Sequence, residues 1–151
     1  MRLLHERFHE VLPRLTAENY RVTSPSTPSY NCIAWAVGVD DVWWWPSPTR
    51  FWPETAPREE TVSAFLAAFA SARYAVCADG EWEPGIEKIA LYVANDRPTH
   101  AARQSSNGKW TSKLGQEVDI EHDTPETVGG GIYGEATVFV SRRAESQATA
   151  R

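Results

Sequence analysis

The first half of the chain carries apolar residues at helical spacing. Residues 2–15 repeat them every three or four positions and predict an amphipathic N-terminal helix, and residues 61–72 predict another. Between these two helices, the apolar run Cys32–Val37 follows a Ser/Pro-rich approach. Asn31 is a good N-cap for this run and Gly38 a good stop, so we expect a short helix that begins at Cys32.

In the second half the apolar period changes towards two, which predicts strands. The expected strands are residues 73–78, 87–94, 99–105, 109–114 and 134–142. Asn107 and Gly108 tolerate a tight turn and predict a hairpin between the third and fourth strands. Residues 116–131 read as an irregular or partly helical polar connection that ends in a flexible triple glycine. We therefore expect one α+β domain over residues 1–143, helices first and an antiparallel sheet after them, with residues 144–151 as a flexible tail.

Composition narrows the classes of function. The chain has 151 residues, 42% hydrophobic content, a net charge of -5 and a pI near 5.4. The longest basic cluster is the pair Arg142-Arg143, which argues against a nucleic-acid partner. We also expect no membrane partner, because no apolar run has transmembrane length. The N-terminus does not resemble a signal peptide, so we expect a cytoplasmic protein in which Cys32 and Cys77 are free thiols, with Cys77 in the core.

Tryptophans and prolines dominate residues 39–57, which rules out a regular helix or strand there. The prolines are Pro46, Pro48, Pro53 and Pro57. The candidate substrate-binding residues of this aromatic loop are Trp43, Trp44, Trp45 and Trp52. They either line a groove for a peptide or glycan beside Cys32 or form a lid packed on the helix at residues 61–72.

Cys32 is the first candidate for chemistry, because a helix start favours the thiolate. Unpaired amide protons and the positive end of the helix dipole lower a thiol pKa, and they can also hold an oxyanion beside the sulfur. The alternative is that Cys32 is a small buried apolar residue.

A catalytic cysteine needs a base and a group that orients the base. His100, at a strand start, is the candidate base, and Asp119 is the candidate third group. His122, Ser112 and Lys113 are alternatives. A two-residue turn in the hairpin would place Lys113 on the face of His100, whereas a three-residue turn would place Ser112 there. The alternative for His100 is a polar residue on an exposed strand face.

We expect no metal site and no cofactor. His5 and His9 have a chelating spacing without a nearby third ligand and are interpreted as part of a solvated face. Cys32, His100, Asp119 and His122 include zinc-ligand types, but they lack the paired short spacings of a structural zinc site.

Several segments carry a family resemblance. The order Asn31-Cys32, the strand Lys88–Val93 and His100-Ala101 resembles the papain-like cysteine hydrolases of the NlpC and amidase types. The segments NCIAWAVG, WWWP, EKIALYV, THAARQ, GKWTSKLGQ and DIEH resemble more closely a family of small bacterial proteins of uncharacterised activity, over residues 24–142. In NlpC-type enzymes the catalytic histidine opens a strand, and Lys88 stands at the matching position here, while His100 matches the orienting position. Either the site has moved one strand along, with His100 as base, or the chemistry has been lost.

The sequence supports two alternative functions. In the first, the protein is a papain-like cysteine hydrolase or acyltransferase acting on a peptide or amide bond, as a peptidase, amidase, deamidase or transglutaminase. In the second, it is a catalytically inactive module that binds a protein or peptide through its tryptophan-rich loop. A Cys32 sulfur within hydrogen-bond reach of an imidazole favours the enzyme, and a buried Cys32 favours the module.

Overall fold

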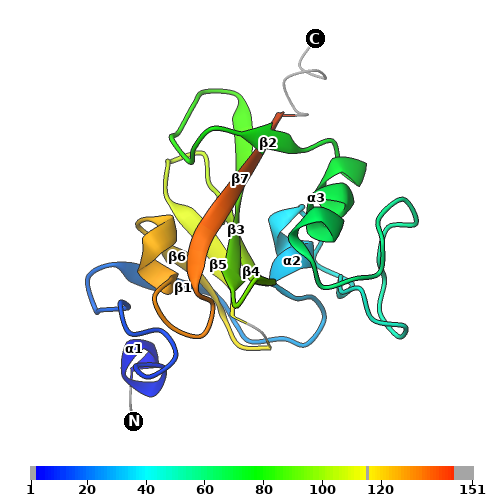
Figure 1. Ribbon diagram of the computed structural model, residues 1–151. Coiled ribbons are helices and arrows are strands. Elements are labelled where there is room, and N and C mark those ends of the chain that lie inside the picture. The colour runs from blue at the N-terminus through cyan, green and yellow to red at the C-terminus, as the bar shows by residue number, and fades with distance from the viewer. Residues whose placement is uncertain (1–2, 115, 145–151) are drawn as a thin grey trace.

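The computed structural model describes residues 3–114 and 116–144, so the predicted tail lies outside the described residues except for Ala144. The described chain is an α+β fold, as expected, with one seven-stranded antiparallel sheet (Figure 1). The helices are α1 (Leu4–Arg7), α2 (Cys32–Ala36) and α3 (Val62–Ser71), and a 3-10 turn η1 spans Pro125–Val128. The strands are β1 (Tyr20–Ser24), β2 (Ala75–Cys77), β3 (Ile86–Ala94), β4 (Arg97–Gln104), β5 (Trp110–Lys113), β6 (Asp119–His122) and β7 (Glu135–Arg143). Their order across the sheet is β1-β6-β5-β4-β3-β7-β2.

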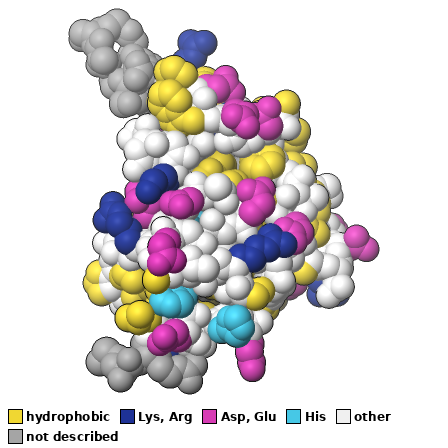
Figure 2. Space-filling view, turned by 90° about the vertical axis from the view of Figure 1, so that its left-hand side faces the viewer, with side chains coloured by type: hydrophobic (Ala, Val, Ile, Leu, Met, Phe, Trp, Pro, Cys, Tyr) yellow, Lys and Arg dark blue, Asp and Glu magenta, His cyan; other side chains and the backbone are white. Residues whose placement is uncertain are grey.

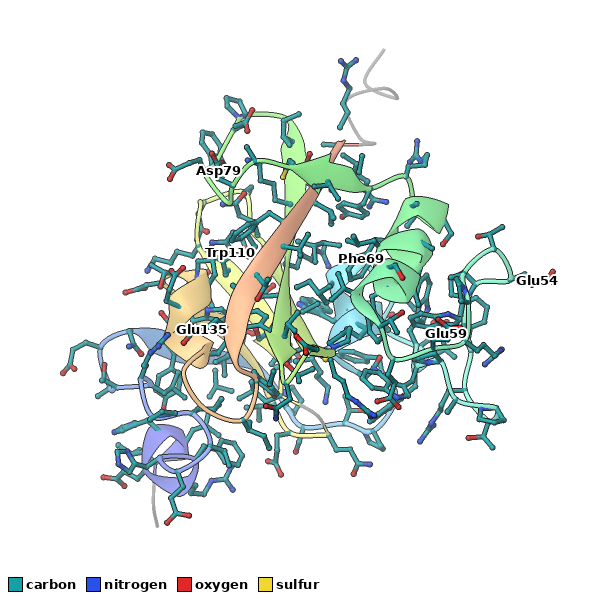
Figure 3. All side chains as sticks on the ribbon, in the orientation of Figure 1. Glu54, Glu59, Phe69, Asp79, Trp110 and Glu135 are labelled. Atoms are coloured by element: carbon teal, nitrogen blue, oxygen red, sulfur yellow. The ribbon has the colours of Figure 1, made fainter. Side chains whose placement is uncertain are left out.

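The sheet divides the core into two layers, and the interior strand β3 contributes to both. Ile89 and Leu91 face the cluster formed with α2 and α3, and Ala90 and Tyr92 face the cluster formed with the N-terminal segment and η1. All four are fully buried, so β3 is covered on both faces. Figure 1 shows α2 and α3 on one side of the sheet and α1 on the other. In Figure 3, Phe69 on α3 and Trp110 on β5 lie on these two sides.

The predicted N-terminal helix is wrong in length. Regular α1 ends at Arg7, although Leu12 and Leu15 are buried as the helical spacing required. The carbonyl of Val11 accepts a hydrogen bond from Ile132 N at 3.0 Å instead of continuing a helix, and Pro13 follows. The apolar positions therefore pack without a continuous helix.

The other predicted elements are confirmed within a few residues, but two strands were missed. β1 and β6 pair with each other, and β6 also pairs with β5. β6 lies in the segment read as irregular, and β1 lies in a segment to which no element was assigned, because strands of four or five residues carry too little alternation to be recognised alone. Their pairing is a tertiary property.

The triple glycine is closely packed, contrary to the expected flexible connection. A Cβ on Gly131 would collide with the carbonyl oxygen of Val11, and one on Gly130 would collide with the Arg14 guanidinium. Arg14 in turn donates two hydrogen bonds to Glu135, at 3.0 and 2.7 Å. Glycine is needed here because the N-terminal segment lies against the loop.

The surface carries charges of both signs. On the face shown in Figure 2, acidic and basic side chains are interspersed. Among the described residues, none of the helices combines the length and apolarity needed to cross a bilayer.

Candidate functional site

Asn31 fixes the geometry around Cys32. Its Oδ1 accepts hydrogen bonds from Ala34 N at 3.2 Å, as an N-cap, and from Trp44 N at 3.1 Å. Its Nδ2 donates to Trp44 O at 2.9 Å. One buried amide therefore caps α2 and anchors the aromatic loop beside the first helical residue, Cys32.

A cavity of about 280 Å³ opens at this junction. Its lining residues are Asn31, Cys32, Trp43, Trp45, Ser47, Arg50, Thr99 and Tyr133. We call it the Cys32 cavity.

The four predicted substrate-binding tryptophans divide into two pairs. Trp43 and Trp45 line the Cys32 cavity. Trp44 and Trp52 are buried in the core between the aromatic loop and α3, with exposed fractions of 8% and 3%. Trp52 packs edge-on against Phe65 of α3, so part of the loop is the lid that the second interpretation predicted.

The Cys32 thiol is protonated in this environment. Burial raises its pKa to about 11, and the opposing effects of the backbone amides of Ala101, Ile33 and Cys32 and of the Lys113 charge are smaller. The expected low thiol pKa is therefore not supported. Cys77, expected in the core, is only half-buried on β2.

His100 lies on the other face of the sheet from Cys32. Cys32 shares its apolar cluster with Ala101, whose side chain leaves β4 on the side of α2. Side chains alternate along a strand, so the neighbouring His100 points to the opposite face. There its ring packs edge-on against Tyr92, at 5.1 Å between centroids, and stacks on Tyr133 at 4.0 Å. The structure does not form the expected hydrogen-bonded pair of thiol and imidazole.

The partner of His100 is Ser112. Ser112 Oγ lies 2.9 Å from His100 Nε2 and 2.8 Å from His122 Nε2, and His122 Nδ1 lies 2.8 Å from the carbonyl of Thr124. Both histidines and the serine are fully buried. Burial lowers the pKa of His122 to about 4 and that of His100 well below its usual value, so both imidazoles are neutral near pH 7.

This chain of hydrogen bonds defines both tautomers. A carbonyl only accepts, so His122 Nδ1 carries a hydrogen and its Nε2 accepts the Ser112 hydroxyl proton. Ser112 then accepts from His100 Nε2–H. The lone pair of neutral His100 is consequently on Nδ1, which is buried and has no hydrogen-bond partner among the described residues.

The hairpin loop explains why Ser112 occupies this position. Ser105 N donates to Lys109 O, which leaves Ser106–Gly108 as a three-residue loop. The register that follows pairs Arg103 with Thr111. This is the alternative that places Ser112 on the face of His100, and Lys113 projects from the other face.

Asp119 belongs to a separate cluster on the side of Cys32. Tyr30 donates its hydroxyl to Asp119 Oδ2 at 2.7 Å, and Asp119 pairs in register with Lys113. The Lys113 ammonium lies 5.3 Å from the Tyr30 ring centroid and donates to Glu117 O at 2.7 Å. Burial lowers the pKa of Lys113, while the charges of Asp119 and Cys32 act to raise it. Asp119 therefore makes no hydrogen bond to His100, whose hydrogen-bond partner is Ser112.

Lys88 has a structural role. Its ammonium contacts Glu83 at 2.8 Å and Asp79 at 3.4 Å. Burial lowers the pKa of Lys88, but the hydrogen bonds and charges of these two carboxylates outweigh it and raise the pKa. A lysine held protonated in this way is a poor base.

Tyr133 is the site residue that the sequence analysis missed. Its ring stacks on His100 within 8° of parallel, and it also lines the Cys32 cavity. Burial raises the Tyr133 pKa, and the nearby Cys32 charge adds to the shift. No sequence pattern around Tyr133 indicated a functional role, because its contact with His100 depends on how the glycine-rich connection packs.

Within the described ranges, no three His, Cys, Asp or Glu side chains are grouped to hold a metal ion. Cys32 and Asp119 lie on one face of the sheet and His100 and His122 on the other, so the zinc-ligand types noted in the sequence do not converge.

The fold and the site define a small α+β protein with a thiol-bearing aromatic cavity, and the family follows from the sequence itself. The family model described as Domain of unknown function (DUF7689) matches residues 21–141, so the chain belongs to this family. No curated protein and no solved structure matches the chain.

Proposed function

We propose that the protein is a peptide- or protein-binding module whose recognition site is the Cys32 cavity. The observation that carries the proposal is the combination of aromatic cavity walls with a protonated thiol. A neutral buried thiol contributes an apolar wall rather than a nucleophile.

The lining residues indicate the chemistry of the ligand. Trp43, Trp45 and Tyr133 provide apolar faces for one large side chain of a peptide. The Arg50 guanidinium lies 4.6 Å from the Trp43 ring centroid and makes no ion pair within the described part of the chain. A carboxylate next to the inserted side chain would bind there. The favoured ligand is an aromatic side chain flanked by an acidic residue.

Calorimetric titration with the peptide acetyl-Glu-Phe-Glu-amide tests this function. Binding should occur in the wild type and weaken about tenfold or more in Trp43→Ala, since buried aromatic contacts dominate such interfaces. Phe51→Ala is the matched control, because Phe51 is an exposed aromatic residue of the same loop outside the cavity. Equal affinity of the wild type and Trp43→Ala would refute the proposal.

A second candidate is papain-like acyl transfer by Cys32. The favouring observation is that three backbone amides, those of Ala101, Ile33 and Cys32, act together to stabilise charge at the sulfur. Cys32 would lose its proton to a base and attack a carbonyl, the amine would leave with a proton, and water would hydrolyse the thioester. On this side of the sheet the charged partner of Cys32 is Lys113 rather than His100.

Mass spectrometry separates the two candidates. Incubation with a p-nitrophenyl acyl ester should leave Cys32 unmodified if the protein only binds. A Cys32 acyl adduct that is absent from Cys32→Ser and turns over with time would favour acyl transfer. Because both cysteines are free, we propose a cytoplasmic setting for either function.

A further inference from the structure

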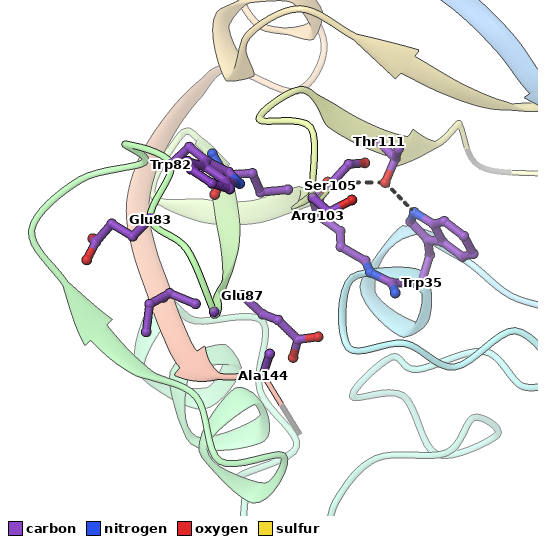
Figure 4. A pocket seen from close by; sticks show the side chains of 12 residues that line it. Trp35, Trp82, Glu83, Glu87, Arg103, Ser105, Thr111 and Ala144 are labelled. Atoms are coloured by element: carbon purple, nitrogen blue, oxygen red, sulfur yellow. Dashed lines mark hydrogen bonds between the residues drawn. The ribbon is translucent and has the colours of Figure 1, made fainter. Parts of the chain in front are cut away.

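A second cavity, larger than the Cys32 cavity and sharing no lining residue with it, lies beside α2. Its volume is about 480 Å³. Residues from α2, the β4–β5 hairpin and the loop before β3 surround it (Figure 4). Trp35 and Trp82 stand on opposite sides, with Arg103 and Ser105 between them. We call it the Trp35–Trp82 cavity.

Arg103 is the cation of this cavity without a carboxylate partner. Its guanidinium lies 4.9 Å from the Trp35 ring centroid, and it makes no ion pair or side-chain hydrogen bond with another described residue. The two acidic side chains of the cavity are already paired. Glu87 accepts from Arg142 at 2.7 Å, and Glu83 contacts Lys88 at 2.8 Å. Five guanidinium donors are thus available to an anion.

Trp35 and Arg103 are held in position without a ligand. The Trp35 indole donates to Thr111 Oγ1 at 3.0 Å, and Thr111 donates in turn to the Arg103 carbonyl at 3.1 Å (Figure 4). A guanidinium fixed on an aromatic ring loses little freedom when it binds a carboxylate.

The remaining walls suit a hydroxylated ring. Trp82 is 47% exposed and its indole forms part of the cavity wall. Ser105, Ser106 and Thr111 add hydroxyl groups.

We infer that the Trp35–Trp82 cavity binds an acidic saccharide. The C–H face of a sugar ring would stack on Trp82, its carboxylate would pair with Arg103, and its hydroxyls would meet the hydroxyls of Ser105 and Ser106. This site is independent of the peptide site at Cys32.

Calorimetric titration with trigalacturonic acid and with neutral maltotriose tests the inference. The acidic trisaccharide should bind at least about tenfold more tightly than the neutral one, and Arg103→Gln should abolish this preference, because only the guanidinium forms charged hydrogen bonds with the carboxylate. Trp82→Ala should weaken binding several-fold. Arg97→Gln, at an exposed arginine outside both cavities, should leave the affinity for both trisaccharides unchanged.

Three results would overturn the inference: no binding of trigalacturonic acid, equal affinity for both trisaccharides, or tighter binding of adenosine monophosphate. The last result would assign the cavity to a nucleotide. Unchanged melting temperatures of Arg103→Gln and Trp82→Ala would show that lost binding reflects the cavity rather than the fold.

Discussion

Ser112 Oγ lies 2.9 Å from His100 Nε2, and through this contact a buried serine links the imidazole of β4 to that of His122 on β6. The link crosses three neighbouring strands inside one apolar layer. It makes Ser112 the group that determines the tautomer of His100.

The first prediction concerns Ser112 and Asp119. Ser112→Ala leaves a buried imidazole nitrogen unpaired on each side, so we expect a loss of about 2 kcal/mol or more in the free energy of unfolding. It should also shift the His100 ring signals in ¹H–¹⁵N NMR spectra. Asp119→Asn should leave those signals in place, because Asp119 contacts Tyr30 and Lys113 instead. Ser26→Ala, at an exposed serine, is the stability control. Displaced His100 signals in Asp119→Asn alone would restore Asp119 as its partner.

The second prediction concerns the two thiols. Iodoacetamide should label half-buried Cys77 before Cys32, which reverses the expectation from helix position. In Cys77→Ser, the rate of Cys32 labelling should rise about tenfold per pH unit from pH 8 to 10, since the Cys32 pKa is about 11. Quenched labelling with peptide mass spectrometry measures both. A Cys32 rate that levels off by pH 8 would show that the thiolate is stabilised after all.

The third prediction concerns acid stability. The pKa of His122 is about 4 in the folded chain and about 6.5 when unfolded, so between these values the unfolded chain binds more protons. Folding stability should therefore be fully present above pH 6.5 and fall as the pH decreases, with His122 contributing a loss of about 3 kcal/mol by pH 4. Urea melts at several pH values measure this slope. His122→Gln should flatten it, whereas exposed His9→Gln should not. The same slope in His122→Gln would contradict the assignment.

The fourth prediction concerns the glycine loop. Gly131→Ala would place a methyl group against the Val11 carbonyl oxygen, so we expect the free energy of unfolding to fall by about 2 kcal/mol or more. Gly38→Ala is the comparison, because no atom lies within 4 Å of its Cβ position and only its φ of +91° opposes the change. Gly38→Ala should lower the free energy of unfolding by about 1 kcal/mol. Thermal unfolding of both variants measures the difference, and a harmless Gly131→Ala would mean that the loop is not packed on the N-terminal segment.

The sequence by itself determined the elements that depend on near neighbours. Asn31 and Gly38 define α2, because capping acts within one turn of chain, and Asn107-Gly108 defines the β4–β5 hairpin through local backbone preference. The apolar run of β3 was equally readable, because a strand buried on both faces carries a long apolar signal. The α+β class followed from these elements.

Only the tertiary structure decided which side chains meet. The hairpin loop has three residues rather than two, and this places Ser112 instead of Lys113 on the face of His100. Side chains alternate along β4, so His100 and Cys32, which had been assigned to one site, lie on opposite faces of the sheet. Strands β1 and β6 became visible only through their pairing. A one-residue change in register moves every side chain to the other face of a sheet, and local sequence preferences leave that register open between distant segments.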